Sequence, residues 1–124
     1  MATRRFIVTP LTDGAGAATY YTPFFNGRIT AIHYIKVDYT NGVDFTITAD
    51  KTGETIWTQV DVNATVSVAP RMATHSNAGV AALYAAGGTA VNDIIRLAGD
   101  RVKIVIAQGG AAHTGQFHVV VEDV

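Results

Sequence analysis

The sequence predicts an all-β protein, a sandwich or barrel of short antiparallel strands. Two observations support this prediction. Short segments alternate between apolar and polar residues, which is typical of strands with one buried face. Eight or nine such segments follow one another along the chain, separated by short turn sequences. At 124 residues the chain suits a single domain, covering 1–124, with a core of its own.

Strand signals recur from one end of the chain to the other. RRFIVT, AATYYT and GRITAIHYIKVD begin the series, and VNDIIRL, RVKIVIAQ and GQFHVVVE end it. The turn sequences TDGAG, NG, DKTG and AGD separate the segments, because Gly and Asn accept positive φ at little cost. The expected strands cover residues 4–9, 17–22, 27–38, 43–49, 54–60, 62–69, 91–97, 101–108 and 115–122.

One hairpin is predicted around the sequence ADKTGETIWTQV. Val43, Phe45 and Ile47 share one face of the first strand, and the turn at 50–53 reverses the chain into the second. The second strand carries Trp57, the only tryptophan. We expect Trp57 to be a core residue rather than an exposed contact, because it is the lone Trp of a small β domain.

Residues 71–90, RMATHSNAGVAALYAAGGTA, break the strand pattern. Ten of these twenty residues are Ala or Gly, and connections of this length are usually functional or flexible. AGVAALYAA at 78–86 predicts two helical turns, ended by the glycines that follow. Val80, Leu83 and Tyr84 would then share a face. Two interpretations stay open, a lid over the end of the sandwich and a contact between subunits.

The last two strands have apolar residues on both faces. Val102, Ile104 and Ile106 alternate toward a core, yet Val105 and Val120 place apolar groups on the side that should meet water. We interpret the two strands as a pair in an exposed sheet. Contact with another subunit would explain the outward valines.

The net charge and the lengths of the apolar runs argue against two classes of partner, nucleic acids and membranes. Nine Lys and Arg against ten Asp and Glu give a formal charge of −1, so we expect no general binding to nucleic acid. No apolar run approaches the ~18 residues of a membrane helix, and no signal peptide is recognised, so we expect no membrane association. Charged residues make up 15%, against about 25% in an average chain, which fits either a surface covered by partners or one rich in Thr, Asn and Gly.

No known catalytic pattern is present in the sequence. The chain has no cysteine, and its two serines, Ser67 and Ser76, do not lie in a nucleophile elbow. His33 and His118 lie within alternating strands, where we expect sheet or core-edge positions rather than metal ligands. We therefore expect no enzymatic activity, no cofactor and no bound metal.

Two stretches, TIWTQVDVNATVSVAPRMATHSNAGVAAL and GDRVKIVIAQGGAAHTGQFHVVVE, carry a resemblance to known proteins. The chain resembles the small capsid decoration, or cement, proteins and minor capsid proteins of tailed bacteriophages. The resemblance implies a jelly-roll-type antiparallel β-sandwich with at most one short helix, in the 71–90 loop. It also implies a structural virion protein that binds the major capsid protein lattice as a homo-oligomer, a dimer or trimer. Such a protein is assembled in the host cytoplasm and lies on the capsid exterior.

The expected interface residues combine the Ala/Gly-rich segment with the outward valines. Ala and Gly permit close approach of backbones, and apolar side chains supply contact area. Arg71 is the expected charged anchor, because its planar guanidinium can hold a partner's carboxylate with two hydrogen bonds. The candidate interface residues are Arg71, Leu83, Tyr84, Val105 and Val120.

An alternative function is a carbohydrate-binding β-sandwich module displayed on a particle. The sequence TYYTPFF, at residues 19–25, supplies the aromatic side chains that a sugar-binding platform requires. The same cluster is also interpreted as a cap on the end of the core. Exposed, coplanar aromatic side chains would favour carbohydrate binding, and buried ones would favour the cap.

Overall fold

The computed structural model describes residues 2–83 and 87–123, and these residues form ten strands and no helix. All nine strands expected from the sequence are present, with ends shifted by a few residues. The tenth strand, the three-residue β7, lies inside the Ala/Gly-rich segment. The strands are β1 Thr3–Val8, β2 Ala18–Tyr21, β3 Phe25–Ile35, β4 Val43–Ala49, β5 Thr55–Val62, β6 Val66–Val68, β7 Arg71–Ala73, β8 Asn92–Asp100, β9 Val102–Ala107 and β10 Gln116–Glu122.

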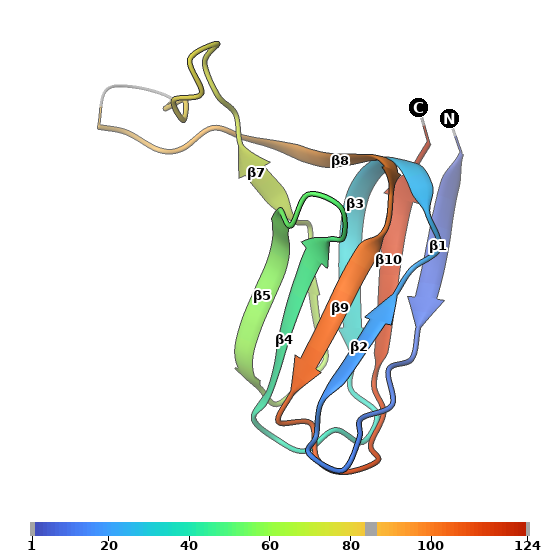
Figure 1. Ribbon diagram of the computed structural model, residues 1–124. Helices are drawn as coiled ribbons and strands as arrows, with labels where there is room; N and C mark the ends of the chain where they lie inside the picture. The colour runs from blue at the N-terminus through green and yellow to red at the C-terminus, as the bar shows by residue number, and fades with distance from the viewer. Residues whose placement is uncertain (1, 84–86, 124) are drawn as a thin grey trace.

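The strands form two antiparallel sheets packed face to face (Figure 1). One sheet has the order β1-β10-β3-β8-β7, with β6 also paired to β3, and the other has the order β2-β9-β4-β5. β1 pairs with β10, β2 with β9, β3 with β8 and β4 with β5, so the chain wraps around the core as one long folded hairpin. This is the strand order of a jelly roll, which confirms the predicted fold class.

The core consists of the inward side chains of both sheets. Alternation places Val43, Phe45 and Ile47 inside, as the sequence predicts. Trp57 is also in the core, with 8% of its surface exposed, which confirms the expectation for the lone tryptophan. Ile56 is buried beside Trp57, because an irregularity in the β4–β5 pairing interrupts the alternation of β5 at this point.

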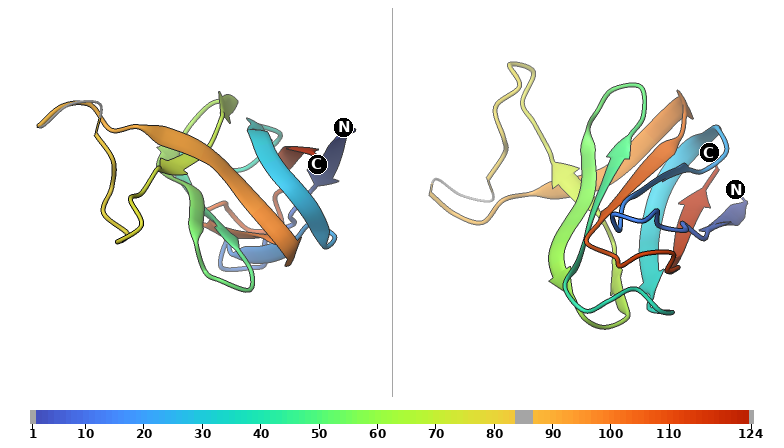
Figure 2. Two further views of the ribbon diagram at one scale, coloured as in Figure 1. Left: turned by 90° about the horizontal axis from the view of Figure 1, so that it is seen from above. Right: turned by 60° about the horizontal axis from the view of Figure 1, so that its bottom comes forward.

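A projecting arm begins where β8 extends beyond its pairing with β3. β3 pairs with β8 near its start and with β6 near its end, so the first residues of β8 pair only with β7. We call residues 71–94 the arm, which comprises β7, the connection after it and the start of β8. Figures 1 and 2 show the arm pointing away from the sandwich. The described part of the connection, residues 74–83 and 87–91, is therefore neither a lid nor part of the core.

The helix expected at 78–86 is absent from its described part, 78–83. The backbone N–H of Ala82 donates to the carbonyl of Thr74 at 2.7 Å, and the N–H of Val91 donates to the carbonyl of Ala82 at 3.1 Å. These bonds replace the i−4 bonds that a helix requires. Gly79, at φ +79°, supports a turn at this place instead. Residues 84–86 lie outside the described residues.

The interpretation of the last two strands as a pair is wrong. β9 lies in the sheet with β2, β4 and β5, whereas β10 lies between β1 and β3 in the other sheet. Val105 and Val120 do face outward, but on opposite faces of the sandwich. Alternation within a strand determines which residues face outward, and it carries no information about which sheet the strand joins.

Tyr39 anchors the chain between β3 and β4. Its ring is buried, and its hydroxyl donates to the carbonyl of Pro10 at 2.6 Å. Burial raises the pKa of Tyr39 above its ordinary value of 10.0. The folded state therefore keeps a proton that the unfolded chain releases, so stability is undiminished below pH 10 and is lost as the pH rises further.

Tyr39→Phe is expected to lower the free energy of unfolding at pH 8 by about 1 kcal/mol, because one hydrogen bond is lost. The same variant should lose less stability than wild type between about pH 10 and pH 11, because it has no phenol to ionise at this buried position. Urea unfolding at each pH measures both effects. Tyr20→Phe, at an exposed tyrosine, is the control for removing a hydroxyl. Equal alkaline losses in wild type and Tyr39→Phe would contradict the prediction.

Candidate interaction surfaces

The arm is exposed and almost without charge. From residue 72 to residue 92 the sequence has no Asp, Glu, Lys or Arg. Val80 and Leu83 are 65% and 47% exposed, and Met72 and Val91 are also exposed. Proteins usually protect an exposed strand edge with charged side chains, Pro or a bulge, and an apolar exposed segment is typical of an interaction site. The arm therefore has the properties of a contact surface.

Two of the predicted interface residues lie in the described part of the arm. Leu83 lies in its connection, paired with Ala90. Arg71 is at its base, where a guanidinium N–H donates to the carbonyl of Pro70 at 2.7 Å. The third, Tyr84, lies outside the described residues. The arm thus contains Arg71 and Leu83, whereas Val105 and Val120 lie in the strands of the sandwich.

A second surface is the outer face of the β2-β9-β4-β5 sheet, which we call the threonine face. Cross-strand pairing places Thr58, Thr46, Val105 and Thr19 in one row across four strands. The Thr46 and Thr58 hydroxyls are 3.4 Å apart. The strand pairing places on this face Thr19, Tyr21, Asp44, Thr46, Thr48, Thr55, Thr58, Lys103, Val105 and Ala107. Asp44 and Lys103 are charged, and Arg101, which is ion-paired with Asp50 at 2.8 Å, stacks on Tyr21 at one end of the face.

The outer face of the opposite sheet is rich in arginine, and we call it the arginine face. Register places Arg5 beside Val120, Arg28 beside Arg96, and Arg71 beside Ile94 on this face. Arg28 and Arg96 form ion pairs with Glu122 at 2.7 Å and with Asp93 at 3.4 Å. The four arginines of the face are Arg5, Arg28, Arg71 and Arg96. Their charge outweighs that of the two carboxylates, although the whole chain has a formal charge of −1.

Two histidines lie side by side in the middle of the arginine face. His118 and His33 are cross-strand partners on β10 and β3, which confirms their expected position on a sheet. Arg5 donates to Nδ1 of His118 at 2.9 Å, and His33 is hydrogen-bonded to Ser67 at 2.7 Å. Burial, then the charge of Arg5 and the proximity of His33, lower the pKa of His118 below 6.5. His118 is therefore neutral at pH 7 and accepts the hydrogen bond from Arg5.

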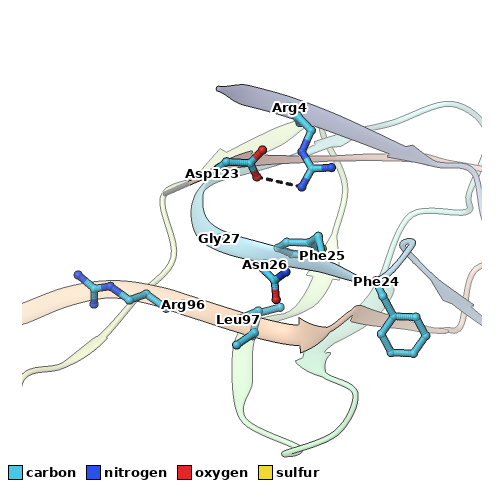
Figure 3. Close-up of a pocket in the computed structure, with 9 residues that line it drawn as sticks. Arg4, Phe24, Phe25, Asn26, Gly27, Arg96, Leu97 and Asp123 are labelled. Carbon is cyan, nitrogen blue, oxygen red and sulfur yellow. Dashed lines mark hydrogen bonds and ion pairs between the residues drawn. The ribbon is translucent and has the colours of Figure 1, made fainter. Parts of the chain in front are cut away.

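A pocket of about 640 Å³ opens near the two chain ends (Figure 3). Phe24, Phe25 and Leu97 give it apolar walls, and Arg4 and Arg96 lie at its sides. Its polar groups already have partners in the protein. Arg4 forms an ion pair with Asp123 at 2.9 Å, Arg96 is paired with Asp93, and the Asn26 side chain accepts a hydrogen bond from a backbone N–H.

The aromatic cluster of residues 19–25 is divided between the core and the surface. Phe25 is buried, as the cap interpretation predicts, whereas Tyr20, Tyr21 and Phe24 are exposed. The Arg101 guanidinium lies 3.9 Å from the centre of the Tyr21 ring and 4.8 Å from that of Phe24. A sugar ring binds by stacking on an open aromatic face, and Arg101 occupies one face of Tyr21. The cluster is therefore a weaker candidate for carbohydrate binding than for a cation–π contact within the chain.

Residues 2–83 and 87–123 contain no group of three His, Asp or Glu side chains that could hold a metal ion. The same residues contain no helix long and apolar enough to cross a membrane. The residues that geometry brings together are those of the arm and of the two outer faces. No sequence pattern predicts the arginine face, because its members come from β1, β3, β7 and β8, far apart in the chain.

The fold and these surfaces define a jelly-roll β-sandwich protein with an exposed arm that carries no charged residue from 72 to 92. Comparisons with protein-family models, with curated proteins and with solved structures find no match to this chain. The function is therefore argued from the surfaces themselves.

Proposed function

We propose that the chain is a structural virion protein of a tailed bacteriophage, which decorates and cements the capsid by binding the major capsid protein lattice as an oligomer. The observation that carries the proposal is the arm. An uncharged ribbon with exposed Val80 and Leu83 is unfavourable in water and favourable against another protein. A rigid sandwich that holds out such a ribbon suits a role in assembly.

The arginine face is the surface that we assign to the capsid lattice. Guanidinium groups bind carboxylates with two parallel hydrogen bonds, and Arg5 and Arg71 are not engaged in any carboxylate hydrogen bond within the described residues. Val120 lies beside Arg5 and supplies an apolar contact at the centre of the face. This assignment keeps Arg71 as the charged anchor expected from the sequence, and it suits an acidic patch on the lattice.

Val120→Asp is expected to weaken capsid binding by about tenfold or more, because it adds a carboxylate where an acidic surface docks. The fold should be retained, since Val120 is only half-buried and its side chain faces outward. Co-sedimentation with capsids that lack the chain, prepared from the phage that encodes it, measures binding, and thermal unfolding checks the fold. Wild-type binding should also weaken between about 0.1 M and 1 M salt, where the Debye length shortens from about 10 Å to 3 Å.

Val37→Asp is the matched control, because it adds the same charge at an exposed valine outside both faces and the arm. It should bind capsids like wild type. Absence of wild-type binding to the capsids would overturn the proposal, and binding of wild-type protein to defined sugars on a glycan array would support the carbohydrate-binding alternative instead. Equal binding by Val120→Asp and Val37→Asp would remove the arginine face from the interface.

A further inference from the structure

We infer that the arm of one copy docks on the threonine face of a second copy, and that this contact forms the oligomer. The inference rests on the proposed function and names the partner of the arm. It assigns Leu83 and Val105, which lie far apart within one chain, to the two sides of one interface.

Charge is the first reason for choosing this face. Burying a charged group is unfavourable unless it finds a partner of opposite charge, so an uncharged ribbon requires an uncharged surface opposite. The arginine face presents four guanidinium groups across its strands. The charged groups of the threonine face lie at its margins: Asp44, Lys103, and an Arg101 that is already ion-paired with Asp50. Its central row of Thr58, Thr46, Val105 and Thr19 carries no charge.

Shape and composition are the second reason. The side chains of this row are short and β-branched, so they project only a short distance from the sheet on all four strands. The Ala and Gly residues of the arm permit its backbone to approach such a surface closely. Methyl groups of Thr and Val then meet Val80 and Leu83, while the Thr hydroxyls remain able to bond to backbone groups of the arm.

The size of the arm agrees with the need of a stable interface. Standard interfaces use about 20–30 residues on each side. The uncharged part of the arm runs from residue 72 to residue 92, which is at the lower end of that range. Because the arm points away from its own sandwich, a threonine face that receives it belongs to another copy (Figures 1 and 2). Each copy has one arm and one receiving face, so a dimer or a ring satisfies every arm.

Disulfide trapping tests the contact, since the chain has no cysteine of its own. Leu83→Cys is mixed with Val105→Cys that carries a size tag, and the mixture is oxidised. The expected result is a mixed disulfide between the two variants as the main cross-linked product. Val120→Cys with the same tag is the matched control, because it is an equally half-buried valine on the outer face of the other sheet. Val120→Cys should form no more mixed disulfide with Leu83→Cys than the same two variants form when they are unfolded, reduced and then reoxidised.

Val80→Cys provides a second arm position, and thermal unfolding confirms that each variant folds. Equal cross-linking to Val105→Cys and Val120→Cys would overturn the inference. The inference would also be overturned if light scattering showed wild-type protein to be a monomer at about 100 µM. The arm would then be assigned to contact with the capsid lattice instead. Either outcome is distinguishable from failure of the proposed function, because capsid binding and its loss in Val120→Asp are measured separately.

Discussion

Replacing Phe45 with alanine is expected to lower the free energy of unfolding by about 3–5 kcal/mol. Phe45 is buried, and its ring centre lies 4.8 Å from that of Trp57 and 5.1 Å from that of Phe117. These contacts join the two sheets, because Phe45 and Trp57 belong to one sheet and Phe117 to the other. The variant loses the buried ring and leaves a cavity between the sheets. Small domains are stable by only about 5–15 kcal/mol, so the loss is a large share of the total.

Urea unfolding, followed by the fluorescence of Trp57, measures the effect of Phe45→Ala. Val60→Ala is the control, since Val60 lies in the same sheet and is 71% exposed. It should change the free energy of unfolding by less than about 0.5 kcal/mol. A loss below about 1 kcal/mol in Phe45→Ala would show that the two sheets do not pack through this ring.

Gly27→Ala is expected to destabilise the fold by about 2–4 kcal/mol, through backbone strain and a steric clash. Gly27 has φ +147°, which side-chain-bearing residues rarely adopt. A Cβ at this position would lie 2.7 Å from the backbone oxygen of Glu122, so β3 and β10 would have to separate. Glycine at this irregularity in the β3–β8 pairing lets β3 approach β10 closely.

Gly53→Ala separates the two causes in the same thermal or urea measurements. Gly53 also has a positive φ, at +74°, but a Cβ there would meet nothing within 4 Å. It should lose only the cost of the backbone conformation, about 1–2 kcal/mol. Equal losses in the two variants would contradict the proposed clash between β3 and β10.

Candidate contact residues were partly predictable from the sequence. The sequence predicts Val105 and Val120 as contact residues, because an apolar residue on the outer side of an alternating strand is unusual. It predicts Leu83 and Arg71 because their segment departs from the strand pattern. Residues of the arginine face such as Arg5 and Arg28 gave no signal, since it is the register of β1, β10 and β3 that brings their side chains to one surface.

The strands, the inward set of core residues and the burial of Trp57 are predictable from the sequence alone. These features depend on local periodicity and on turn residues, which act over a few neighbouring positions. The sequence also indicated that residues 71–90 differ from the rest. It predicted two helical turns there, but Ala82 bonds to Thr74 and Val91 instead, and such partners are selected only when distant segments meet.

The division of the strands between the two sheets becomes visible only in the folded molecule. The consecutive strands β9 and β10 belong to different sheets, so Val105 and Val120 face opposite sides of the molecule. The same strand pairing produces the arm. β3 pairs with β8 near its start and with β6 near its end, so β8 extends beyond its pairing with β3. Strand pairing depends on contacts between residues far apart in the chain, and their free energy depends on the packing of the whole core rather than on any one segment.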